Sequence, residues 1–140
     1  MKTAVDSSVL LDVLSADQQF GEASRHALRG AYDAGALVAC DVVWAEVRAH
    51  FGDDSDFGRA VALLGVVFEP ISAEAAKAAG RLWREASRAV GHGRARLVAD
   101  FLIGAHAAVQ ADALLTRDRG FYRRYFDVDI IEPGARRGRR

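Results

Sequence analysis

The feature that most constrains the fold of this chain is the alternation of short apolar runs with longer segments of helical spacing. Strands that alternate with helices favour a parallel sheet with helices packed against it. We therefore predict an α/β fold with a mainly parallel central sheet. The β-type runs are TAV before Asp6, ALVAC before Asp41, VVFEPI at 66–71, ALLT before Arg117 and VDII at 128–131.

The intervening segments carry apolar residues at helical spacing. We expect Asp41 and Ser72 to be helix N-caps, Gly35 and Gly91 to end helices, and residues 91–96 to form a loop. The last of the long helices contains FLIGAHAAV and is apolar on nearly every side, which predicts a position in the middle of the fold. The expected helices cover residues 7–14, 18–34, 42–51, 55–65, 72–90 and 97–111.

The length of 140 residues, 51% of them hydrophobic, predicts one domain over residues 1–134. The remainder, ARRGRR at 135–140, offers nothing to bury and is expected to be disordered. No apolar run approaches the length of a membrane span. Cys40 is the only cysteine, so no internal disulfide can form. A soluble cytoplasmic protein is the resulting expectation.

The formal net charge is zero, yet the two halves of the chain differ. Residues 1–70 hold 5 Lys/Arg and 11 Asp/Glu, whereas residues 71–140 hold 14 and 8, so the halves carry −6 and +6. This asymmetry is compatible with one acidic locus that holds cations and one basic surface that meets an anionic partner.

Four acids stand at positions where charge is unusual. Asp6 and Asp118 follow apolar strands, at the sheet edge where open parallel sheets bind ligands. Glu46 and Asp100 lie in apolar helical segments. Converging carboxylates cannot neutralise one another, but Mg²⁺ or Mn²⁺ prefers oxygen ligands and promotes phosphodiester hydrolysis. The pattern therefore predicts a metal site.

Each acid also has an ordinary structural interpretation. Asp6 and Asp118 are residue types that suit turns and caps, and Asp100 is favoured by the dipole at a helix N-terminus. Glu46 has Arg48 or a neighbouring helix as an alternative partner.

Four segments together, AVDSSVLLDVL, VVWAEV, RLVADFLIGAHA and ALLTRDRGFYRRYF, resemble a PIN-domain nuclease of the VapC toxin type. The resemblance implies a three-layer α/β/α sandwich, bound Mg²⁺ or Mn²⁺, and cleavage of RNA. It also implies a homodimer and a small antitoxin partner, with a heterotetramer or larger assembly between them. By motif match, the implied catalytic and metal-binding acids are Asp6, Glu46, Asp100 and Asp118, and Thr116 takes the family's Ser/Thr position.

Basic residues near these acids form a candidate RNA platform, with a solvated face and inward-packed tyrosines as the equal alternative. We expect His106 to be a hydrogen-bonded core residue, His92 to lie in a loop and GDDSD at 52–56 to be a cap and turn. Asp12 is predicted either to line the cleft or to be a surface acid. The RNA-binding candidates are Arg94, Arg96, Arg117, Arg119, Arg123 and Tyr122.

Two other functional classes remain as alternatives. One is a catalytically degenerate PIN fold kept as a protein-binding module, although all four acids are present. The other is a phosphatase with an aspartyl nucleophile, which would need a second acid where Ser8 stands.

Overall fold

The computed structural model describes residues 1–90 and 97–134. The predicted helix end at Gly91, the loop at 91–96 and the tail at 135–140 lie outside the described residues. The same is true of His92, Arg94 and Arg96.

Five parallel strands form a single sheet in the order β3-β2-β1-β4-β5, so the predicted parallel sheet is confirmed. β1 is the central strand, and its residues Thr3 and Val5 pair with Ala113 and Leu115 of β4. The carboxyl ends of β1 and β4 therefore lie side by side. The strands are β1 Lys2–Val5, β2 Ala36–Ala39, β3 Val66–Phe68, β4 Ala113–Leu115 and β5 Asp129–Ile131.

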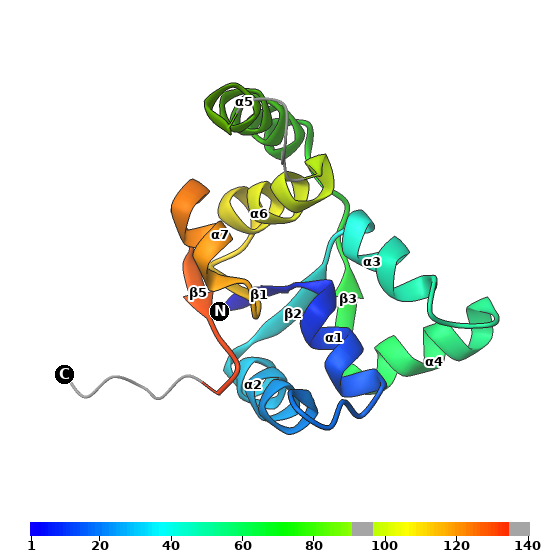
Figure 1. Cartoon of the computed structure of the whole chain (residues 1–140). Helices are drawn as coiled ribbons and strands as arrows, with labels where there is room; N and C mark the ends of the chain where they lie inside the picture. The colour runs from blue at the N-terminus through cyan, green and yellow to red at the C-terminus, as the bar shows by residue number, and fades with distance from the viewer. Residues whose placement is uncertain (91–96, 135–140) are drawn as a thin grey trace.

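Helices cover both faces of the sheet (Figure 1). In that view α5, α6 and α7 lie above the sheet and α1, α2 and α4 lie below it, which completes the three layers. The sheet order requires this division, because right-handed crossovers in opposite directions place their helices on opposite faces. The helices are α1 Ser7–Leu14, α2 Gly21–Ala34, α3 Asp41–Arg48, α4 Asp54–Leu64, α5 Ala73–Val90, α6 Val98–Gln110 and α7 Arg119–Tyr125.

The observed helices differ from the predicted ones by more than one residue in three places. The helix expected from residue 18 begins at Gly21, because the Asp17 carboxylate accepts the Gln19 and Phe20 amides in a turn. The helix expected to reach residue 51 ends at Arg48, whose guanidinium donates to the Phe51 carbonyl at 2.9 Å. Helix α7 was not predicted, since its seven residues are too few to show a clear period.

The cap predictions had mixed outcomes. The predicted cap at Asp41 is wrong by one residue: Cys40 holds the N-cap position, and Asp41 opens the first turn, where the helix dipole favours an acid. Ser72 does cap α5, through its hydroxyl and the Ala75 amide. Gly35 follows the last residue of α2, as predicted, and the Asp53 carboxylate caps α4 within the predicted cap and turn.

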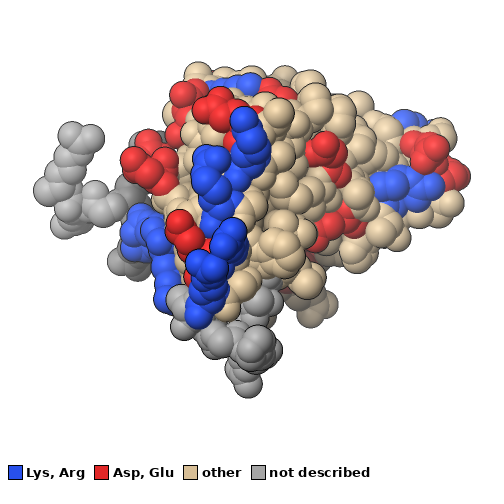
Figure 2. Space-filling model, turned by 90° about the horizontal axis from the view of Figure 1, so that it is seen from above, with Lys and Arg blue, Asp and Glu red and all other residues tan. Residues whose placement is uncertain are grey.

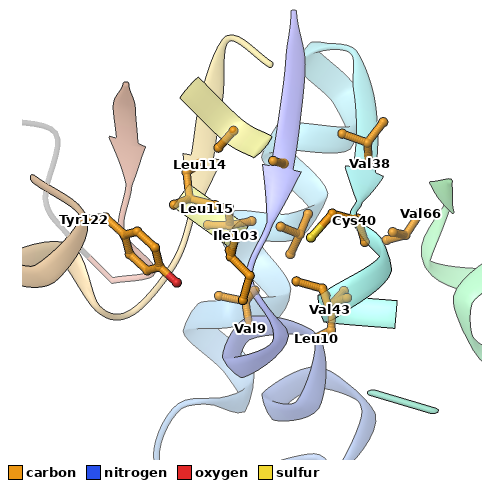
Figure 3. Close-up of a cluster of buried hydrophobic side chains, with 14 of the residues drawn as sticks. Val9, Leu10, Val38, Cys40, Val43, Val66, Ile103, Leu114, Leu115 and Tyr122 are labelled. Atoms are coloured by element: carbon orange, nitrogen blue, oxygen red, sulfur yellow. The ribbon is translucent and has the colours of Figure 1, made fainter. Parts of the chain in front are cut away.

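The hydrophobic core surrounds β1 (Figure 3). Val9 and Leu10 of α1, Ile103 of α6 and Leu114 and Leu115 of β4 meet there, all at most 3% exposed. Most of α6 between Phe101 and Ala107 is buried, which confirms its predicted central position. Because α6 spans the core, it brings Asp100 in its first turn to the edge of the sheet.

No helix among residues 1–90 and 97–134 has the length and apolar character needed to cross a membrane. Cys40 is buried at 1% exposure, so the thiol is a core residue.

Close packing of α6 gives a test of this fold. A Cβ at Gly104 would collide with the Phe126 ring, whereas a Cβ at Gly80 of α5 would meet nothing within 4 Å. We expect Gly104→Ala to destabilise the chain by about 2–3 kcal/mol through overpacking. Gly80→Ala should stabilise it by up to about 1 kcal/mol through helix propensity. Urea unfolding of both variants measures the contrast, and equal effects would contradict the described packing.

Candidate active site

Asp6 occupies the junction between β1 and α1. Its Oδ1 accepts the Ser7 amide at 2.8 Å and so caps α1, while its Oδ2 accepts the Thr116 hydroxyl at 2.7 Å. The residue is 7% exposed. The alternative interpretation of Asp6 as a helix cap is therefore confirmed. Its second carboxylate oxygen, Oδ2, is held by Thr116, which follows a different strand.

Thr116 links Asp6 to Asp118. It is fully buried just after β4, where it donates to Asp6 and its Oγ1 accepts the Asp118 amide at 3.0 Å. The Asp6 amide in turn donates to the Leu115 carbonyl at 2.9 Å. These bonds tie the ends of the two central strands together, and Asp118 then takes the N-cap position of α7.

Glu46 approaches Asp6 from helix α3 through Ser7. The Ser7 hydroxyl lies 3.4 Å from Asp6 Oδ1 and 3.3 Å from Glu46 Oε1. Glu46 is exposed as a residue, so the expectation that it sits where charge is excluded is wrong; Val43 and Val47 form the buried face of α3. The suggested Glu46–Arg48 pair is also absent, since Arg48 binds Asp54 at 2.7 Å.

Ser7 and Ser8 were not predicted as part of the site. The Ser8 hydroxyl lies 3.5 Å from Asp6 Oδ2. Serines that follow a strand-end acid are the available signal, because hydroxyls in a first helical turn can reach back to the cap residue.

The acids act on one another electrostatically. Burial raises the pKa of Asp6 above its usual value, hydrogen bonds from Thr116 and Ser7 oppose this effect, and the charges of Asp100 and Asp118 raise the pKa further. The pKa of Glu46 is also raised, first by partial burial of its carboxyl and then by Asp6 and Asp100. The structure therefore brings Glu46, Asp100 and Asp118 within electrostatic range of Asp6.

These carboxylates do not form a tight cluster. Among the residues described, no three Asp, Glu, His or Cys side chains are close enough to make a ready metal site. The donor set nevertheless suits a hard divalent cation, because it consists of carboxylate and hydroxyl oxygens. Binding such an ion would require the carboxylates to approach more closely.

Asp12 has a structural role that the sequence did not indicate. It is 5% exposed in α1, so the surface-acid alternative is wrong. Its carboxylate accepts Arg117 Nε at 2.6 Å and Nη2 at 3.1 Å, and the Ser24 hydroxyl at 2.8 Å. The guanidinium also lies 4.0 Å from the centre of the Phe20 ring.

The Asp12–Arg117 pair has a consequence for the site. Because Arg117 stands between Thr116 and Asp118, the pair holds the segment that carries both. Arg117 is a predicted RNA-binding residue, but its guanidinium is bound to Asp12 and its side chain is only 33% exposed.

The other predicted RNA-binding residues differ in their exposure, and His106 was predicted to be a core residue. Tyr122 is 1% exposed, so it cannot stack on RNA; the alternative of an inward-packed tyrosine is confirmed for it. Arg119 lies 3.6 Å from Glu132, and Arg123 is exposed. His106 is 1% exposed with its Nε2 3.0 Å from Glu69 Oε1, which confirms the hydrogen-bonded core histidine.

Comparison with known proteins identifies the family of this chain. The family model described as the PIN domain matches residues 3–127. The chain belongs to the PIN-domain family. No curated protein matches its sequence.

Solved structures share the PIN fold at low sequence identity. VapBC2 from Rickettsia felis bound to a promoter DNA fragment is 14% identical, with a TM-score of 0.70 over 94% of this chain and 98% of that one. VapBC-1 from nontypeable Haemophilus influenzae is 18% identical, with a TM-score of 0.67 over 94% and 98%. Mycobacterium tuberculosis VapC20, a sarcin-ricin loop cleaving toxin, is 14% identical, with a TM-score of 0.58 over 89% and 96%.

The raised pKa of Asp6 predicts that its negative charge destabilises the PIN fold. A carboxyl whose folded pKa is raised favours folding at low pH and loses that contribution as pH rises through the folded value. Asp6→Asn can keep the Ser7 bond and reverse the direction of the Thr116 bond, because the introduced amide can donate to the Thr116 hydroxyl oxygen. We expect it to raise Tm by about 3–5 °C at pH 8 in EDTA, and by less at pH 4. Thermal unfolding across this range measures the difference, and a lower Tm at pH 8 would contradict it.

The Asp12–Arg117 pair predicts a large loss of stability when one partner is removed. Arg117→Ala leaves a buried carboxylate without its cation and should cost about 3 kcal/mol. Arg119→Ala, next but one in the chain and more exposed, should cost less than about 0.5 kcal/mol. Urea unfolding compares them; a small effect of Arg117→Ala would show that the pair does not hold the segment.

Proposed function

We propose that this PIN-domain protein is a Mg²⁺- or Mn²⁺-dependent endoribonuclease that acts as the toxin of a toxin–antitoxin pair. The observation that carries this proposal is the electrostatic coupling of Asp6 to Glu46, Asp100 and Asp118 at the carboxyl edge of the sheet. Because neighbouring acids raise the pKa of Asp6 and of Glu46, the ionised carboxylates oppose folding, and their common location favours a cationic ligand.

The chain's residues have separable roles in the proposed reaction. Asp6, Asp100, Glu46 and Asp118 would hold the divalent ion, which when bound supplies water activation and neutralises charge on the phosphate. Thr116 orients the Asp6 carboxylate through its 2.7 Å bond and fixes the Asp118 backbone. Ser7, between Asp6 and Glu46, limits how these two carboxylates can turn.

Space for a substrate adjoins the acids. A groove of about 610 Å³ opens between α3, α5 and α6 beside Glu46. Its walls include the apolar side chains of Val42, Ala45, Ile71 and Leu102, together with Asp41. An extended RNA strand can enter such an open groove, whereas a deep pocket would select a small ligand.

A second groove supports the antitoxin partner. It lies between α2 and α4, measures about 420 Å³, and is lined in part by Leu28, Tyr32 and Leu63. Tyr32 and Leu63 are 53% and 87% exposed, an amount of apolar surface that a partner helix would cover. Three proteins of similar fold were solved as VapBC or FitAB, which agrees with this role. A homodimer stays a prediction.

RNA cleavage by the purified protein tests the nuclease proposal. We expect cleavage with Mg²⁺ or Mn²⁺ and none in EDTA, and a loss of at least about a hundredfold in Asp6→Asn and Asp100→Asn. Asp33→Asn is the matched control, because Asp33 is an exposed acid paired with Arg29 on α2. The toxin role is tested separately by growth arrest on expression, which Asp6→Asn should relieve.

The following results would contradict the nuclease proposal or its metal mechanism. Cleavage that persists in EDTA, or undiminished activity in both site variants, would overturn the metal mechanism. A wild-type protein that binds an antitoxin but cleaves no RNA with either ion would favour the degenerate binding module instead.

A further inference from the structure

Helix α5 carries a row of basic side chains that the sequence analysis did not single out. Lys77, Arg81, Arg84 and Arg88 are all exposed, and we refer to these four residues as the basic stripe. Figure 2 views the molecule from the α5 side and shows Lys and Arg side chains gathered in a band across this face.

Helical geometry places the basic stripe on one narrow surface. At about 100° per residue, spacings of four, three and four residues fall within an arc of about 60°, and the stripe extends about 17 Å along the axis. The opposite side of α5 is its packed face, where Ala75 and Ala79 are fully buried. The four cations therefore point away from the protein.

The basic stripe lacks the ion pairs that other exposed arginines make. Arg25 and Arg29 on α2 bind Glu22 and Asp33, and Arg59 on α4 binds Asp56. Within residues 1–90 and 97–134, no acid forms such a pair with the stripe, although Glu74 and Glu85 share its helix. Its charge is thus available to an external anion.

The basic stripe leads toward the acids. The Ser72 amide just before α5 bonds to Gln110 at the end of α6, and the two helices pack against each other, so they run antiparallel. The Arg88 end of α5 accordingly lies at the end of the hairpin where α6 begins. Asp100 is in that first turn of α6.

We propose that the basic stripe binds the sugar–phosphate backbone of an RNA strand whose scissile phosphate lies at the four acids. Evenly spaced cations on a line suit a polyanion of regular charge, and arginine binds phosphate in a forked geometry. The proposal rests on the proposed ribonuclease function and adds the path of the strand. Because the stripe contacts the backbone and not the bases, its affinity for RNA should depend on the length of the strand and not on the base sequence.

Binding measurements on the full chain test this proposal. The variant Arg81→Gln/Arg84→Gln/Arg88→Gln removes three charges of the stripe, and Arg25→Gln/Arg29→Gln/Arg59→Gln removes three from α2 and α4. A fluorescent single-stranded RNA of about 20 nucleotides is titrated in EDTA at several salt concentrations. We expect the stripe variant to bind at least about tenfold more weakly, with a slope of log affinity against log salt shallower by about 2. The control should match wild type.

Kinetics separate this proposal from the function it rests on. In the stripe variant, KM for long RNA should rise while kcat stays near the wild-type value, because the acids are untouched. Equal loss of affinity in both variants, or none in the stripe variant, would overturn the proposal while wild-type cleavage still supports the nuclease. Absence of wild-type cleavage and RNA binding would instead overturn the proposed function. Weaker antitoxin binding with unchanged RNA affinity would assign the stripe to a protein partner and overturn the proposal.

Discussion

A buried hydroxyl is the contact on which the arrangement of this site depends. Thr116 donates to Asp6 and accepts from the Asp118 amide, so one side chain sets the position of one acid and the backbone of another. The residues Thr116 and Asp6 are 110 positions apart, and they meet because β1 and β4 are adjacent parallel strands. The pairing of β1 with β4 therefore determines the local geometry at Asp6 and Asp118. An alteration of the β1–β4 register would separate Asp6 from Thr116 before it disturbed the rest of the core.

Neutral donors make this concentration of charge compatible with folding. Asp6 receives hydrogen bonds from a backbone amide and from hydroxyls, which favour its ionised form against burial and against the neighbouring acids. The Asp12–Arg117 pair contributes differently, by closing the segment between β4 and α7 with a charged contact to α1. Helix α6 supplies the remaining constraint, since its buried sides fix the backbone at Asp100. The backbone at the acids is thus held by three different kinds of interaction, which leaves side-chain rotation as the way for the carboxylates to approach one another around the proposed cation.

The sheet and six of the helices could be predicted from the sequence because each depends on short-range pattern. The four acids stay a prediction as catalytic residues, although the positions of two of them follow from the strands. Asp6 directly follows a strand and Asp118 closely follows one, and strand ends in a parallel sheet meet at one edge. The Asp12–Arg117 contact spans 105 positions, and nothing in either local segment indicates the other partner. The predicted RNA contact of Tyr122 is wrong because Tyr122 lies on the buried face of α7. That face could not be predicted, since α7 is too short to show a helical period. Ser7 was overlooked because its importance lies in joining Asp6 to a helix residue 39 positions away.

The two helical layers of the sandwich face opposite directions, and this separates two kinds of recognition. Helices α2 and α4, with the groove between them, lie on one side of the sheet, while α5 with the basic stripe lies on the other (Figure 1). A partner seated on the first side leaves the second uncovered. On the functions proposed above, a partner bound between α2 and α4 and an RNA strand bound along the basic stripe would not compete for the same helices, so inhibition by the partner would not require release of the RNA.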